Sequence, residues 1–317
     1  VLIIMDGVGA RTNDDGNAFF LARTPVFDSL SKSCPYTLLK AHGTAVGLPS
    51  DADMGNSEVG HNALGAGRIF DQGAKLVDKS IESKQIFTTD VWKKLLDKPV
   101  KSKSALHFIG LLSDGNVHSH INHLFKLIEQ AAHEGVKKIR VHILLDGRDV
   151  PETSALEYVN SLENFLASFN AKGFDFCIAS GGGRMVTTMD RYEADWNIVK
   201  RGWDAHVLGK GRAFTSATDA IETFRKEQPD ITDQYLPAFV IIKNGKPVGT
   251  IQDGDSVILF NFRGDRAIEI SRAFEDKDFN KFDRERYPDV IFAGMMEYDG
   301  DLHIPKNYIV YPTSIDK

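Results

Sequence analysis

Arginine side chains recur in this sequence beside glycine or aspartate, most of them directly after short apolar runs. They are Arg148, Arg184, Arg191, Arg263 and Arg266. A guanidinium group can donate two parallel hydrogen bonds to a phosphate or a carboxylate, so several of them together can hold a small polyanion. Arginines on solvated helix surfaces, the ordinary alternative, would not recur at the ends of separate apolar runs. The pattern therefore predicts a binding site for a small anion.

Two other stretches place a chemically useful side chain among small residues. Asp6 stands in Asp6-Gly7-Val8-Gly9, and Ser57 stands in Gly55-Asn56-Ser57-Glu58-Val59-Gly60. Each has a plain alternative, because Asp6 can be a helix N-cap and Ser57 can simply begin a helix. The functional interpretation makes Asp6 a ligand of a hard divalent metal and Ser57 a nucleophile activated by metal coordination. The glycines near Ser57 lack the G-x-S-x-G spacing, which disfavours a Ser-His-Asp hydrolase.

Three histidines lie in the stretch Ser113–His123. His118 precedes the expected helix and is the candidate to contact a phosphate or to pass a proton. His120 and His123 would share one side of a helical turn, as in some zinc sites, but no third ligand completes the set nearby. We therefore expect these two to be polar residues at the start of a helix.

The elements that must position these side chains alternate along the chain. Residues 121–134 and 156–169 carry apolar side chains at the helical period of about 3.6, whereas residues 239–251 predict a hairpin around Asn244-Gly245. Strand–helix alternation predicts an α/β fold with a mainly parallel sheet, whose ligands bind beyond the carboxyl ends of the strands. The apolar runs expected to be strands are Val1–Met5 and residues 105–112, 141–145, 176–179 and 257–262.

Composition narrows the class of protein. With 317 residues, 42% hydrophobic and 26% charged, the chain suits a soluble globular protein of two domains. A net charge of −6 argues against a general nucleic-acid binder, and no apolar run reaches the length of a membrane span. No basic region followed by an apolar region opens the sequence, so no signal peptide is expected. No Walker A or G-x-G-x-x-G motif supports nucleotide binding. Cys34 and Cys177 are expected to be buried thiols in a reducing compartment.

Six stretches, taken together and in this order, resemble the signature stretches of the cofactor-independent phosphoglycerate mutases, a family of the alkaline phosphatase superfamily. They are Asp6–Gly9, Met54–His61, Ser113–His120, Asp146–Asp149, Gly183–Arg191 and Asn261–Arg266. Residues 181–196 resemble the plant and trypanosomatid form in particular. The resemblance implies a monomeric, cytoplasmic enzyme that interconverts 3-phosphoglycerate and 2-phosphoglycerate through a phosphoserine, without bisphosphoglycerate.

The resemblance also implies roles for individual residues. Asp6 and Ser57 would bind one of two divalent metal ions, Mn²⁺ with Mg²⁺ or Co²⁺ as alternatives, and Ser57 would accept the phosphoryl group. Asp149 would lie near the hydroxyl groups that exchange protons. The residues around the phosphoglycerate would be His118, Arg148, Asp149, Arg184, Arg191, Arg263 and Arg266.

The family fold implied is an alkaline-phosphatase-like parallel-sheet domain interrupted by an inserted α/β transferase domain. We place the first part at residues 1–71, the insertion at residues 72–305 and the return to the first domain at residues 306–317. The family's remaining metal ligands and a substrate-binding lysine belong to a segment beyond Lys317, so this stretch alone is expected to bind metal weakly and to be inactive. The alternatives are a phosphatase or another mutase of the superfamily, and an inactive fragment that binds phosphoglycerate.

Overall fold

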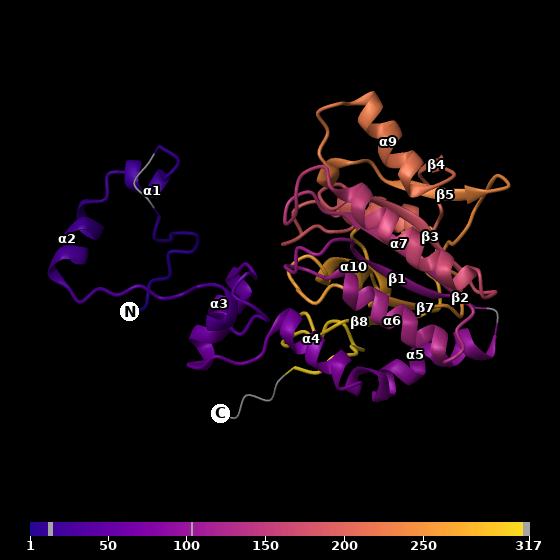
Figure 1. Cartoon of the computed structure of the whole chain (residues 1–317), viewed down its shortest axis with the longest axis horizontal. Coiled ribbons are helices and arrows are strands. Elements are labelled where there is room, and N and C mark those ends of the chain that lie inside the picture. The colour runs from indigo at the N-terminus through magenta and orange to yellow at the C-terminus, as the bar shows by residue number, and fades with distance from the viewer. Residues whose placement is uncertain (12–14, 103, 313–317) are drawn as a thin grey trace. The chain divides into compact units, whose positions relative to one another are not determined.

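A computed structural model describes residues 1–11, 15–102 and 104–312 (Figure 1). The backbone divides into two compact units, Val1–Phe70 and Asp71–Lys317. Each unit is considered by itself below. The predicted assignment of domains, including a return segment at residues 306–317, stays a prediction, and residues 313–317 lie outside the described part.

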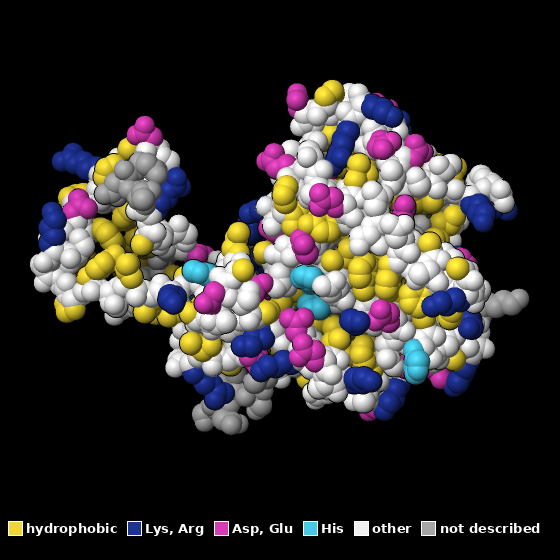
Figure 2. All heavy atoms as spheres, viewed as in Figure 1, with side chains coloured by type: hydrophobic (Ala, Val, Ile, Leu, Met, Phe, Trp, Pro, Cys, Tyr) yellow, Lys and Arg dark blue, Asp and Glu magenta, His cyan; other side chains and the backbone are white. Residues whose placement is uncertain are grey.

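The first unit contains helices and loops among its described residues. Its elements are α1 (Ala18–Leu21), α2 (Pro25–Ser33), a 3-10 turn at Gly43–Val46 and α3 (Ser57–Ala66). Among the described residues of this unit, only Val46, Leu48 and Val59 form a buried cluster, and apolar side chains are visible on the unit's surface (Figure 2). The predicted strand Val1–Met5 is wrong, because no described segment pairs with its backbone. The predicted burial of Cys34 is also wrong, since this thiol is exposed where so few apolar neighbours surround it.

The described residues of the second unit form an eight-stranded sheet in the order β4-β5-β3-β2-β1-β7-β8, with β6 paired to β5. The pairs among β3, β2, β1, β7 and β8 are parallel, which confirms the predicted α/β fold. The strands are β1 (Leu106–Leu111), β2 (Lys138–Leu145), β3 (Asp175–Gly183), β4 (Arg212–Phe214), β5 (Phe239–Lys243), β6 (Lys246–Pro247), β7 (Ser256–Leu259) and β8 (Ile291–Gly294).

The predicted hairpin is confirmed as β5 and β6, which pair antiparallel across Asn244 and Gly245. Both turn residues have positive φ, 53° and 72°, the conformation that favours Asn-Gly in a two-residue hairpin. β5 also runs antiparallel to β3, so the sheet is mixed at this edge.

Helices cover both faces of the sheet, because its central strands are apolar on both sides. On β1, Leu106 and Phe108 belong to one core cluster, while Ile109 and Leu111 belong to the other. The first cluster includes residues of α4 (Gly73–Glu82), α5 (Asp90–Lys101), α6 (Ile121–His133), α7 (Ala155–Asn170) and α9 (Ala217–Glu227). The second includes residues of α8 (Trp196–His206) and α10 (Ile268–Glu275). Helices α6 and α7 confirm the two helices predicted from periodicity. Within the described residues, no helix has the length and apolar character needed to cross a membrane.

Three histidines are fully buried near the second cluster: His107 on β1, His142 on β2 and His206 on α8. Burial lowers the pKa of each imidazole because it disfavours the charged form, and it brings the pKa of His206 to about 3. These rings are therefore neutral in the folded protein at pH values where the unfolded chain binds protons.

We expect acid to destabilise the second unit from about pH 6.5 downward. The unfolded state then binds protons that the folded state excludes, so each buried imidazole lowers the free energy of unfolding by up to ~1.4 kcal/mol per pH unit. Urea unfolding followed by fluorescence reports on this unit, because all three tryptophans lie in it. An unfolding free energy that stays constant between about pH 7.5 and 5.5 would contradict the expectation.

Candidate functional site

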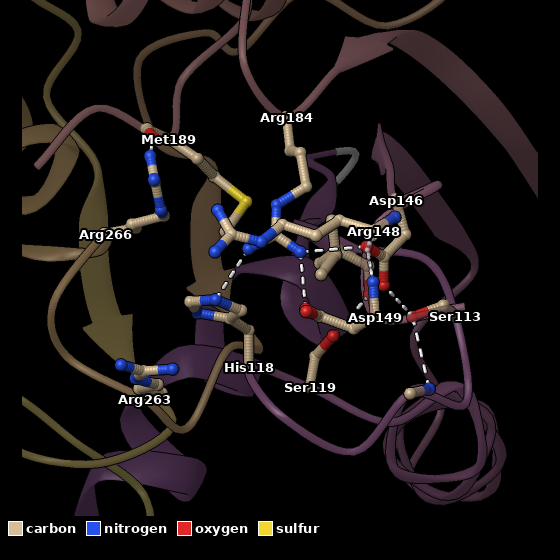
Figure 3. Close-up of polar contacts among 12 residues, drawn as sticks. Ser113, His118, Ser119, Asp146, Arg148, Asp149, Arg184, Met189, Arg263 and Arg266 are labelled. Atoms are coloured by element: carbon tan, nitrogen blue, oxygen red, sulfur yellow. Dashed lines mark hydrogen bonds and ion pairs between the residues drawn. The ribbon is translucent and has the colours of Figure 1, made fainter. Parts of the chain in front are cut away.

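The carboxyl ends of neighbouring parallel strands bring polar side chains together at one edge of the second unit's sheet (Figure 3). Ser113 follows β1, Asp146 follows β2, Arg184 follows β3 and Asn261 follows β7. The sequence predicted this edge as the ligand site, and these strand ends do carry the polar groups.

Arg184 lies at the centre of the site and is only 1% exposed. Its Nη1 donates to Asp146 Oδ1 at 2.8 Å and to Asp149 Oδ2 at 2.5 Å. Its Nη2 contacts His118 Nε2 at 2.7 Å (Figure 3). A guanidinium can only donate, so His118 Nε2 accepts and the proton of the imidazole lies on Nδ1.

His118 is a neutral acceptor. Its burial, reinforced by the positive charge of Arg184, holds the pKa of the imidazole well below its usual range. Nδ1 lies 3.5 Å from Asp265 Oδ1, and it has no closer hydrogen-bond partner among the described residues. This N–H can therefore turn toward an acceptor that enters the site, for which a phosphate oxygen is suited.

Asp146 organises the loop after β2, a role that the sequence analysis missed. Its Oδ1 accepts from the backbone N–H groups of Arg148 at 3.2 Å and Asp149 at 3.1 Å, in addition to the Arg184 bond. Its Oδ2 accepts from Ser113 Oγ at 2.6 Å. The sequence feature that could have identified Asp146 is its position at the end of an apolar run, two residues before the Arg148-Asp149 pair.

A second missed carboxylate, Asp265, lies among the remaining cations. Arg263 Nε is 3.2 Å from its Oδ1, and Arg191 Nη1 is 3.7 Å from its Oδ2. Arg266 is buried and donates to the Met189 carbonyl at 2.6 Å. Burial, followed by the charge of Arg184, lowers the pKa of the Arg266 guanidinium. A surplus of guanidinium groups over carboxylates makes this edge of the sheet attractive to anions.

The structure brings all of the predicted substrate-binding residues to one region: His118, Arg148, Asp149, Arg184, Arg191, Arg263 and Arg266. The other two histidines of the Ser113–His123 stretch lie at the start of α6, as expected. His120 is its N-cap and accepts from Asn122 N at 3.1 Å. His123 is buried and bonds Asp78 Oδ1 at 2.7 Å.

In the first unit, Ser57 Oγ donates to Asp6 Oδ2 at 2.5 Å. Ser57 begins α3, but the N-cap is Asn56, whose side chain accepts from Val59 N at 3.2 Å. Asp6 caps no helix, since the next described helix begins at Ala18. Gly55 allows the backbone of Ala41 to approach the segment before α3 closely, because a Cβ at residue 55 would lie 1.9 Å from the Ala41 carbonyl oxygen.

The Asp6 carboxylate and the Ser57 hydroxyl are two adjacent oxygen donors of the kind that hard divalent cations prefer. Such ions take about six ligands, so the pair supplies part of a coordination sphere. Within residues 1–11, 15–102 and 104–312, no group of three or more His, Cys, Asp or Glu side chains could hold a metal ion.

The fold and the site define an α/β domain with a cluster of arginines, suited to a small anion, at the carboxyl edge of a parallel sheet. The sequence model described as "BPG-independent PGAM N-terminus" matches residues 77–300. The chain belongs to the 2,3-bisphosphoglycerate-independent phosphoglycerate mutase family.

Several relatives carry that name. A Leptospira interrogans protein named a probable 2,3-bisphosphoglycerate-independent phosphoglycerate mutase is 60% identical over 100% of this chain and 58% of its own length. The Trypanosoma brucei brucei protein is 54% identical with the same coverage, 100% and 58%. A structure of Leishmania mexicana phosphoglycerate mutase, solved at low cobalt concentration, matches with a TM-score of 0.94 and 56% identity, covering 98% of this chain and 57% of that one. The chain thus spans somewhat more than half the length of these relatives.

We expect Asp146→Asn to lower the free energy of unfolding of the second unit by about 2–4 kcal/mol, because a buried guanidinium loses part of its compensating charge. Glu227→Gln is the control, since Glu227 and its partner Arg212 form an ion pair in which both side chains are exposed. This variant should unfold with nearly the wild-type free energy, because exposed ion pairs contribute little to stability. Urea unfolding of the two variants measures the difference. Equal losses would show that Arg184 does not depend on Asp146.

Proposed function

We propose that the protein carrying this chain interconverts 3-phosphoglycerate and 2-phosphoglycerate through a phosphoserine at Ser57, without bisphosphoglycerate. The observation that carries the proposal is the arginine cluster around His118 and Asp149, in a member of a mutase family. A phosphoglycerate has a phosphate and a carboxylate a few bonds apart, so it needs several cationic donors. A phosphatase would not need to retain the dephosphorylated acid, and these arginines would retain it.

The arginine cluster would bind both ends of the substrate. Arg148, Arg191, Arg263 and Arg266 would hold its anionic groups, while Arg184 keeps the Asp149 carboxylate in a fixed place. Asp149 would accept a hydrogen bond from a glycerate hydroxyl and could take its proton when that hydroxyl attacks. The Nδ1–H of neutral His118 would donate to a phosphate oxygen.

Ser57 would be the phosphoryl acceptor. Its hydroxyl already donates to Asp6 Oδ2, and this hydrogen bond would hold Oγ in place for in-line attack on phosphorus. As the bond from Oγ to phosphorus forms, the bond from phosphorus to the glycerate oxygen would break, and a protonated Asp149 would give that oxygen its proton. Glycerate, held by arginines, would then reorient, and its other hydroxyl would give its proton to the Asp149 carboxylate as it takes the phosphoryl group. Exclusion of water during this interval would protect the phosphoserine from hydrolysis.

Two divalent metal ions are part of the proposal, Mn²⁺ with Mg²⁺ or Co²⁺ as alternatives. Asp6 and Ser57 would supply two oxygen ligands of one ion, and a related structure was obtained with cobalt. A bound ion would favour the serine alkoxide and neutralise charge on the phosphoryl oxygens. We further propose a cytoplasmic monomer acting on a small molecule, without nucleic-acid or membrane partners, in keeping with the net charge of −6.

Ser57→Ala should lower the mutase kcat of the full-length protein by at least about 1,000-fold, or ~4 kcal/mol, because the phosphoryl group loses its acceptor. The variant should also lose the phosphoserine that mass spectrometry detects after incubation with 3-phosphoglycerate. Ser29→Ala, an exposed serine on α2 of the same unit, is the control and should keep full activity. Activity of Ser57→Ala within about tenfold of wild type, ~1.4 kcal/mol, would exclude the phosphoserine mechanism.

Arg263→Ala and Arg266→Ala should each lower kcat/KM by about 10- to 100-fold, because each removes a charged donor to the substrate. Glycerate should also escape more often, so the ratio of free phosphate to isomerised product should rise. Arg212→Ala is the control, since Arg212 forms an exposed ion pair with Glu227. Unchanged kinetics and an unchanged product ratio in both variants would place Arg263 and Arg266 outside the substrate site. Phosphate release without isomerisation in wild type would favour a phosphatase, and binding without turnover would favour an inactive phosphoglycerate-binding protein.

A further inference from the structure

A chain of buried polar side chains crosses the face of the sheet that α8 covers. Every member is at least 94% buried, although most of its neighbours are apolar. Its members, in the order in which they bond one another, are Asp255, His107, His142, Ser180, His206 and Thr188. The distances between the bonded atoms of successive members are 3.0, 2.9, 2.7, 2.7 and 2.9 Å.

Asp255 sets the direction in which the hydrogen bonds of this chain are donated. Its carboxylate also accepts from the backbone N–H groups of Ala105 at 2.7 Å and Gln252 at 2.8 Å. Burial alone would raise the pKa of this carboxyl, but the His107 bond and these N–H donors leave it lowered. Asp255 is therefore an acceptor only, and His107 must donate to it through Nε2.

Each neutral imidazole has one N–H, so the remaining directions follow. His107 Nδ1 accepts from His142 Nε2, and His142 Nδ1 accepts from the Ser180 hydroxyl. Ser180 Oγ accepts in turn from His206 Nδ1, which leaves His206 Nε2 as an acceptor. The last donor is the Thr188 hydroxyl, so every hydrogen bond points from Thr188 toward Asp255.

Thr188 occupies a costly backbone conformation. Its φ is 70°, a region that β-branched residues rarely adopt. Helix α8 holds it there: Thr188 N donates to Ile198 O at 2.8 Å, and its hydroxyl bonds His206. A Cβ on Gly202 would lie 2.0 Å from Thr188 Oγ1, so α8 approaches this closely only because residue 202 is glycine.

Thr188 stands in the middle of the segment that connects Arg184 to Arg191. The next residue, Met189, provides the carbonyl that accepts from Arg266 (Figure 3). The position of this segment therefore decides where several guanidinium groups of the site lie.

We propose that Thr188 and His206 are positioning residues: the one-way hydrogen-bond chain from Thr188 to Asp255 holds the 184–191 segment, and through it places Arg184, Arg191 and Arg266 for the substrate. The kinetic part of this inference rests on the proposed mutase function, whereas the structural part does not.

Nitrogen NMR of the full-length protein with ¹⁵N-labelled histidine tests the direction of the chain without any assay of function. At neutral pH we expect His107 and His142 as the Nε2–H tautomers and His206 as the Nδ1–H tautomer. His206→Asn, His142→Asn and His107→Asn assign the signals. A different tautomer at any of the three, or an imidazolium among them, would overturn the proposed chain.

Thr188→Val tests the positioning, with Thr187→Val as the matched control. Thr187 is adjacent and buried, and its hydroxyl has no hydrogen-bond partner among the described residues. In Thr188→Val we expect KM for 3-phosphoglycerate to rise about tenfold with kcat changed less than about threefold, because the arginines bind substrate before the chemical step. Amide exchange in residues 184–191 should become about tenfold faster. Thr188→Ser, which keeps the hydroxyl, should restore both values.

The outcomes separate this inference from the proposed function. If the wild-type protein binds and turns over no phosphoglycerate, the proposed function fails, and the exchange rates of Thr188→Val and Thr187→Val still decide the structural inference. If Thr188→Val lowers thermal stability but leaves both KM and segment exchange unchanged, Thr188 is merely structural and the inference is overturned. The inference is also overturned if Thr187→Val changes KM and the amide exchange of residues 184–191 as much as Thr188→Val does.

Discussion

Burial of one positive charge organises the candidate site. The Arg184 guanidinium is almost free of solvent contact, so the folded state must surround it with acceptors. Those acceptors come from two other strand ends, Asp146 and Asp149 after β2 and His118 after β1. Satisfying a single buried cation therefore fixes three loops against one another. Because these donors are already oriented, the proposed binding of an anion would require little further ordering of the site.

The α/β fold and the location of the site could be predicted because their signals are local. Apolar runs followed by glycine and a charged residue mark strand ends, and helical periodicity marks α6 and α7. Because parallel strands end at the same edge of a sheet, the location of these residues could be predicted without knowing how distant segments pack. The Asn244-Gly245 hairpin was predictable for the same reason, since its turn depends only on residues beside it.

The parts that escaped prediction depend on which distant segments meet. Asp146 and Asp265 resemble ordinary turn aspartates, and only the folded chain shows that each lies among arginines. His107 and His142 interrupt apolar strands, but no local feature reveals that their rings bond each other. Strand formation at Val1–Met5 and burial of Cys34 failed because both require packing partners that the described part of the first unit does not provide.

The position of β1 between β2 and β7 has a consequence for the order of folding. Ala105 bonds Asp255, a residue 150 positions away, so this side of the sheet closes only after a long intervening chain has collapsed. Such contacts are slow to form because the entropy of loop closure is lost before they contribute stability. The loop after β7 carries Arg263 and Arg266, and it reaches the edge of the sheet only at that stage. The arginine cluster should thus be among the last features to assemble.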